Sequence, residues 1–447
     1  MIEVLRTTGR ALRMHWPVLL AWQVAGTLGW YVSIELAGYV GAVSAIAGSL
    51  LLPIGILCRL IPFVAMLLVV RDEMRALQSL APVPAQGAAR RTAFLDALLA
   101  GILPFFAFYA AWGYLEEDTS AYFRRVLETN FGFAAQEITG AAAVGDGQAG
   151  SLGFGPLSIA LVVVAFTARW LLGRYRSRLP KIAGLLAAYL EALWVFLTLF
   201  LIRDALDLLG GWVADRQAMV WLADVREAIA QGFAPLAFVW EGVEWLLGEA
   251  GGLILLPVAW LAIAGVVYGQ AVAPERLKIR VAMLDGVRER YRSVPARVRA
   301  RLSDLWASIT GRFRPIGAAL VLMWRAGPVL IGGYVLLYTV LIAVERLLFL
   351  AATRLVGPHD LAFWFTNMEL VTVAVPFLVE PLRVALVAGA YDAVIGTLIV
   401  RRERAAADAA ITAQASVETP ETAAAPPTAG PAGEPAPASL RRHRRRP

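Results

Sequence analysis

Side chains that carry redox, metal or nucleophilic chemistry are scarce in this 447-residue chain. Cys58 is the only cysteine, and only three histidines and two lysines are present. A lone cysteine cannot close a disulfide within the chain or supply a cysteine metal cluster. The histidines, His15, His359 and His443, are scattered, and the chain has no HExxH, Walker motif or nucleophile elbow. We therefore expect no cofactor and no metal, and the sequence favours a non-enzymatic protein over an enzyme.

Apolar residues are what the chain has in excess. The residue types AVILMFWYC make up 59% of it, only 17% is charged, and the mean hydropathy is +0.64. Soluble domains are about 45–50% apolar and about 25% charged, and a membrane span needs about 20 apolar residues in a row. The sequence therefore predicts an all-α polytopic transmembrane helix bundle over residues 1–404. We expect about eight spans, arranged as four helical hairpins, at residues 16–37, 50–70, 92–115, 152–172, 182–202, 252–273, 328–350 and 370–400.

The distribution of Lys and Arg predicts the orientation of these spans. Residues 274–325 carry twelve Lys and Arg against four acids, between two long apolar runs. Short loops rich in Lys and Arg stay on the cytoplasmic side. This basic cytoplasmic loop places most of the 41 Lys and Arg inside and the acidic segments 116–151 and 203–251 outside. We therefore predict a multi-pass protein of a prokaryotic plasma membrane with both termini in the cytoplasm.

Two segments outside the spans are expected to meet the membrane surface or the cytoplasm. Apolar residues recur every three or four positions over residues 294–313, flanked by Arg297, Arg299 and Arg301. This pattern predicts an amphipathic helix whose arginines bind anionic lipid headgroups. The Ala/Pro-rich tail, residues 405–447, has few large apolar side chains and is predicted to be disordered. Its terminal arginines lack interleaved aromatic residues, so no nucleic acid is expected as a partner.

Ionisable residues inside the predicted spans are the main site candidates, because each costs about 2.5–3.5 kcal/mol at a helix centre. Arg59 is nine residues into the second span and Glu191 is nine residues into the fifth, which enters from the opposite side. At about 1.5 Å per residue, both lie about 13 Å from their own surface. We therefore predict that the two side chains face one another. Such a pair could form a polar site or relay, or an ion pair that only fixes helix packing.

Four more ionisable residues lie in the last two spans. Glu345 and Arg346 are near the predicted outer end of the seventh span, where simple interfacial anchoring would explain them. Glu380 and Arg383 are three residues apart on the eighth span, so they can neutralise each other on one helical face. That span is overlong and holds two prolines, so it is expected to be tilted, broken or partly outside the hydrocarbon. Interrupted polar helices of this kind occur at transport sites, and a merely kinked helix is the plainer alternative.

The pattern favours a permease-like or lipid-handling component with an intramembrane polar site. The main alternative is a structural or assembly subunit that docks partners through its loops, and a membrane-embedded lipid enzyme is a third. The expected partners are the lipid bilayer and anionic lipid headgroups, with a protein partner or a separate ATPase subunit as a further class. A separate ATPase subunit would be needed for any ATP-driven role, because the chain has no Walker motif of its own. Nothing in the sequence indicates a substrate.

Overall fold

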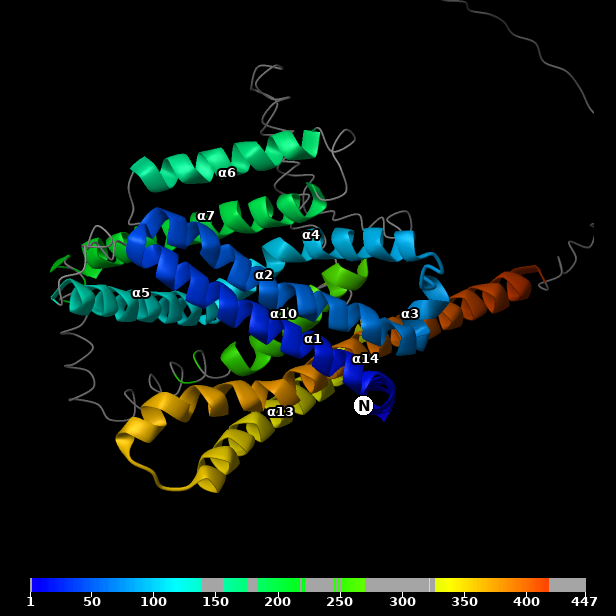
Figure 1. Cartoon of the computed structure of the whole chain (residues 1–447). Helices are drawn as coiled ribbons and strands as arrows, with labels where there is room; N and C mark the ends of the chain where they lie inside the picture. The colour runs from blue at the N-terminus through cyan, green and yellow to red at the C-terminus, as the bar shows by residue number, and fades with distance from the viewer. Residues whose placement is uncertain are drawn as a thin grey trace, which may run out of the picture. The chain divides into compact units, whose positions relative to one another are not determined.

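In the computed structural model, every regular element in the described part of the chain is a helix (Figure 1). Eight of the described helices are long and apolar enough to cross a membrane. The predicted all-α bundle with eight spans is therefore confirmed. The chain divides into two units, residues 1–398 and 399–447, and the packing given below is that of the first. The described residues are 2–138, 156–174, 183–214, 251–269 and 326–417, with single positions at 216, 217, 219, 221, 245, 248 and 321.

Helices α1 (Ile2–Val43) and α2 (Ala45–Val70) are joined by a single residue and pack side by side (Figure 1). Ser44 begins α2, and its hydroxyl accepts a hydrogen bond from the Ala47 N–H at 3.5 Å. Gly26 allows the two helices to approach closely, because a Cβ there would lie 2.6 Å from Cγ of Pro62. This close packing places the indole of Trp30 against Arg59.

Helix α1 begins at Ile2, well before the predicted span at residues 16–37, and continues into that span without a break. Val4 and Ala11 are buried, at 2% and 0% exposure. The Thr8 hydroxyl donates to the Val4 carbonyl at 2.8 Å and lies 3.3 Å from the Ala385 carbonyl oxygen of α14 (Leu361–Val417). The apolar face of this segment packs on α14, which explains why the helix is not interrupted.

Helix α5 (Tyr114–Ile138) is the largest departure from the sequence prediction, which placed these residues in an outer loop. It follows α4 (Gly87–Ala111) after a turn in which Gly113 has a φ of +80°, a value that favours glycine. The helix is too polar to be a candidate span, and it packs on α1. Its buried positions, Leu115, Asp118, Tyr122 and Val126, are spaced three or four residues apart. This stripe is the helical signal that the high charge content concealed.

Small residues hold α5 close to α1 and α2. A Cβ at Gly38 would lie 2.4 Å from Cγ of Arg125, and one at Gly41 would lie 2.4 Å from the Tyr122 hydroxyl oxygen. The Arg125 guanidinium forms an ion pair with Glu35 of α1 at 2.7 Å. Because both glycine positions are filled by α5 side chains, the position of α5 on the bundle is closely fixed.

Helix α10 (Gly251–Gly269) packs on α4 and on α2. Helices α6 (Pro156–Arg174) and α7 (Ala183–Ala214) lie side by side in Figure 1, and α7 also packs on α2 and α4. The fully buried Tyr268 of α10 donates its hydroxyl to the Leu67 carbonyl of α2 at 2.8 Å. The Tyr334 hydroxyl of α13 (Pro328–Val356) donates to the Pro257 carbonyl of α10 at 2.9 Å. These tyrosines join α2, α10 and α13 through hydrogen bonds to backbone carbonyls.

Helix α14 is one uninterrupted helix of 57 residues that includes Pro376 and Pro381. Of the predicted alternatives, which were a tilted span, a broken span or a span partly outside the hydrocarbon, the broken one is wrong. The helix also continues to Val417, past the start of the tail that was predicted to be disordered from residue 405. The residues there are rich in alanine, the strongest helix former, which accounts for the extension. Residues 418–447 lie outside the described part of the chain, as do the predicted amphipathic helix and its Arg297, Arg299 and Arg301.

Candidate functional site

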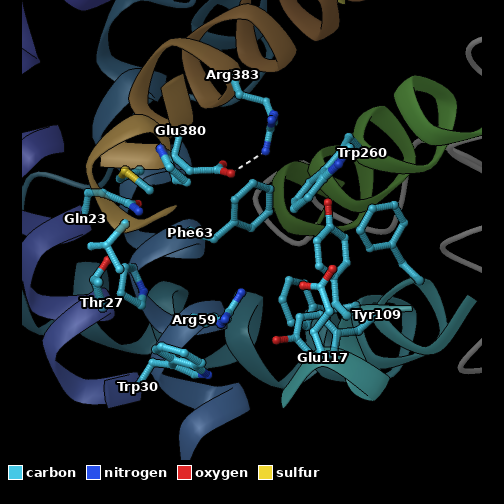
Figure 2. A pocket seen from close by; sticks show the side chains of 18 of the residues that line it. Gln23, Thr27, Trp30, Arg59, Phe63, Tyr109, Glu117, Trp260, Glu380 and Arg383 are labelled. Carbon is cyan, nitrogen blue, oxygen red and sulfur yellow. Dashed lines mark hydrogen bonds and ion pairs between the residues drawn. The ribbon is translucent and has the colours of Figure 1, made fainter. Parts of the chain in front are cut away.

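A cavity of about 290 Å³ lies among α1, α2, α4, α5, α10, α13 and α14 (Figure 2). Four of the six predicted intramembrane candidates line it, namely Arg59, Glu345, Glu380 and Arg383. Glu117 of α5 adds a fifth charge. Seven of the other lining residues are aromatic, namely Trp30, Phe63, Phe105, Phe108, Tyr109, Tyr114 and Trp260. The structure thus brings charges from four helices into one space walled by rings.

Arg59 forms one end of this space together with Asp118, Trp30 and Tyr109. Its Nη2 lies 3.1 Å from Oδ1 of Asp118, and its Cζ lies 4.4 Å from the centre of the Trp30 ring. The Asp118 carboxylate also accepts hydrogen bonds from Trp30 Nε1 at 3.0 Å and from the Tyr109 hydroxyl at 2.7 Å. The Asp118 side chain is 3% exposed and that of Arg59 is 34% exposed. Asp118 therefore lies behind Arg59, which faces the cavity.

The charge on Asp118 depends on these neighbours. Burial raises the pKa of Asp118 above its ordinary value, while Arg59, Tyr109 and Trp30 all act to lower it. Burial likewise raises the pKa of Tyr114, which lines the cavity and stays a neutral phenol at ordinary pH. The ionised carboxylate of Asp118 is thus stabilised by three donors that the fold brings to it.

The predicted pairing of Arg59 with Glu191 is wrong. Arg59 pairs with Asp118, and the buried carboxylate of Glu191 forms its ion pair with Arg169 of α6. The sequence placed the two residues at matching depths in their predicted spans, but depth does not specify the direction in which a side chain points. Neither Glu191 nor Arg346 lines the cavity, and Arg346 is exposed on α13.

Arg383 forms the other charged group of the cavity. Its Nη1 pairs with Glu380 one turn away on α14, as their three-residue spacing predicted, and Figure 2 shows this contact. Its Nη2 pairs with Glu345 of α13 at 2.5 Å, so one guanidinium joins two helices. The Arg383 side chain is 7% exposed, against 27% for Glu345 and 24% for Glu380. The arginine is the buried member, and the two carboxylates are the more accessible ones.

Negative charge is in excess around the cavity. Asp118 neutralises Arg59, while the single charge of Arg383 is shared between two carboxylates. Glu117 is exposed and forms no ion pair with any residue that the structure describes. The buried indole N–H of Trp260 also has no hydrogen-bond partner among the described residues. The wall thus combines aromatic rings, which attract cations through their faces, with carboxylates that lack a full complement of positive charge.

The sequence did not identify Glu117, Asp118, Trp30 and Tyr109 as candidates for the cavity or its charged contacts. The two acids were assigned to an outer loop because they follow the third apolar run directly. The available signal was the position of Asp118 within the stripe of buried residues on α5. An acid on the buried face of a helix requires a partner, and Arg59 is the cation that the fold supplies.

Comparisons with protein-family models, with curated proteins and with solved structures found no match to this chain. The site is therefore interpreted from its own residues. Within the described ranges, no three His, Cys, Asp or Glu side chains are grouped as a metal ion would require. The geometry shows a cavity with charged groups and aromatic side chains in its wall.

Proposed function

We propose that this multi-span membrane protein is permease-like and binds a small organic cation in the cavity lined by Arg59, Glu117, Glu345, Glu380 and Arg383. The observation that supports this function is the excess of carboxylates over arginines in a space walled by aromatic rings. Placement in a prokaryotic plasma membrane, with both termini cytoplasmic, belongs to the same proposal. The distribution of Lys and Arg along the chain supports the orientation in this proposal.

Electrostatics favours a cation over an anion here. A charge within the apolar part of a membrane is costly unless a partner compensates it. Two carboxylates share the one charge of Arg383 between two spans, and the exposed Glu117 beside them has no described ion-pair partner, so a bound cation would supply the missing positive charge. The contact of Arg59 with Trp30 already places a cation on a ring face of this cavity, at 4.4 Å. A quaternary or primary ammonium group could meet the other rings in the same way.

The two arginines have a positioning role in this proposal. Arg383 holds Glu345 and Glu380 toward each other from α13 and α14. Arg59 holds Asp118 and so fixes α5, which carries Glu117, against α2. Movement of α14 or α5 relative to the other helices would change the spacing of the carboxylates, which is the kind of coupling that a permease requires.

Calorimetric titration of the purified protein with benzyltrimethylammonium tests this function. We expect saturable binding that weakens about tenfold or more in Glu117→Gln, because one charge-assisted contact is lost. Glu128→Gln is the matched control, since Glu128 is an exposed acid of the same helix and lies outside the cavity. Phenylacetate, an anion with the same ring, should bind far more weakly. Equal binding of the two probes, or equal effects of the two substitutions, would contradict the proposal.

A further inference from the structure

A second cavity, of about 330 Å³, lies where α2 ends, between α1, α2, the link over residues 81–86 and the start of α4. Its polar lining consists of Arg71, Asp72 and Arg90. Its apolar lining consists of Trp22, Ala65, Leu68, Val69, Val83, Pro84, Ala93 and Phe94. One cavity therefore holds two guanidinium groups next to an extended apolar wall. None of these residues lines the first cavity.

Arg71, of the short 3-10 helix Arg71–Glu73, is a buried cation without a carboxylate partner among the described residues. The residue is 4% exposed, and its Nη2 donates to the Ala81 carbonyl at 2.7 Å. Its Nε is buried and has no hydrogen-bond partner in the described part of the chain. The hydrogen bonds of this buried guanidinium go to neutral carbonyls, and the neighbouring Asp72 acts on it only without a direct ion pair, so an anion could still compensate the charge.

Arg90 places a second guanidinium at the same cavity. Its Nε donates to the Pro84 carbonyl at 2.8 Å, which fixes the side chain over the link between α3 (Arg75–Leu80) and α4. Arg90 is exposed, and it too has no ion pair to a described carboxylate. Asp72 is the one acid in the lining, so the cavity has a net positive charge. A guanidinium can donate two parallel hydrogen bonds to the oxygens of a phosphate, so two arginines in one cavity favour a phosphate group as the ligand.

We propose that this cavity binds the phosphate ester of an anionic membrane phospholipid. Arg71 follows the apolar run of α2 directly, so the two arginines lie at the depth of lipid headgroups. The apolar side chains of α1, α2 and α4 continue from the arginines along the spans, where they meet an acyl chain. A soluble phosphate would share the contacts with the guanidinium groups and would make no use of this apolar wall.

Native mass spectrometry of the full chain in detergent can count bound phosphatidylglycerol and phosphatidylcholine. We expect one phosphatidylglycerol to be retained at least about tenfold more tightly than phosphatidylcholine. Arg90→Gln should remove that preference, since a lost charge-assisted contact is worth about a factor of ten. Arg91→Gln is the matched control, because Arg91 is an exposed arginine next along α4 and lies outside the cavity. It should leave the preference within about twofold of the unaltered protein.

Competition with inorganic phosphate distinguishes a phospholipid from a free phosphate ion. Phosphate at millimolar concentration should not displace the bound phosphatidylglycerol; displacement would identify a soluble phosphate as the ligand and refute the lipid. Arg71→Lys keeps the charge but loses the two-pronged guanidinium, so it should weaken the retention of phosphatidylglycerol. The melting temperature of Arg90→Gln should equal that of the unaltered protein, which would show that its loss of lipid preference does not come from unfolding. Equal retention of the two lipids, or equal losses in Arg90→Gln and Arg91→Gln, would overturn the proposal.

Discussion

Replacement of Asp118 by asparagine should destabilise the protein more than any change to an exposed acid of α5. The Asp118 carboxylate is 3% exposed and accepts hydrogen bonds from Trp30 and Tyr109 in addition to its ion pair with Arg59. Breaking a buried ion pair from one side costs about 3–5 kcal/mol. Arg59 is a third exposed and can regain some hydration, so we expect about 3 kcal/mol for Asp118→Asn, near the lower limit. Arg59→Met should cost a similar amount, because it leaves the buried carboxylate without its cation.

The variant with both substitutions tests whether Arg59 and Asp118 stabilise the fold as a pair. If the two side chains stabilise the fold as a pair, Arg59→Met with Asp118→Asn should cost about 3 kcal/mol and not the sum of about 6, a coupling of about 3 kcal/mol. Unfolding by titration from mild detergent into sodium dodecyl sulfate would measure all four proteins. Glu128→Gln on the exposed face of α5 should change the unfolding free energy by less than about 0.5 kcal/mol. Simple addition of the two single effects would refute the pairing of these residues.

Three other predictions follow from the packing. Gly41→Ala should lower the free energy of unfolding by about 1–3 kcal/mol, because its Cβ would lie 2.4 Å from the Tyr122 hydroxyl oxygen. Gly9→Ala, whose Cβ would have no atom within 4 Å, should leave the free energy of unfolding unchanged or raise it. Glu191→Leu should lower the melting temperature, and Arg169→Leu should partly restore it; rescue by Arg59→Leu instead would show the contact with Arg169 to be wrong. Deletion of residues 418–447 should leave the melting temperature of the spans unchanged, and a marked loss would show that the tail packs on them.

The sequence was sufficient to predict the class of fold and the number of spans. Length and hydropathy of the apolar runs determine whether a helix can cross a membrane, and those properties are local. The ends of the helices were harder to predict. The first turns of α1 and the alanine-rich end of α14 are helical beyond the apolar runs, because Val4 and Ala11 pack on a helix distant in sequence and because alanine favours helix.

Of the six residues predicted from the sequence, four line the candidate cavity and two do not. Charges inside spans are rare enough that each one identifies a polar environment, which is why Arg59, Glu345, Glu380 and Arg383 could be selected. Their partners could not be predicted in the same way. The contact of Glu380 with Arg383 follows from spacing on one helix, whereas Asp118 reaches Arg59 only because a polar helix packs on α1 through small residues. Such a contact depends on rotation about the helix axes, which span depth does not specify.

Accessibility of a single cysteine in the cavity tests the permease-like function most directly. Thr27 lines the cavity, and Cys58 is the only native cysteine, so Thr27→Cys in a Cys58→Ser background carries one reactive thiol. The membrane-impermeant cation trimethylammonium-ethyl methanethiosulfonate can be added to right-side-out or to inside-out vesicles. We predict that this thiol reacts from both sides, and faster with the cationic reagent than with the anionic sulfonate analogue once intrinsic rates are normalised. Reaction from one side only, or a preference for the anion, would contradict a permease-like cavity that binds cations.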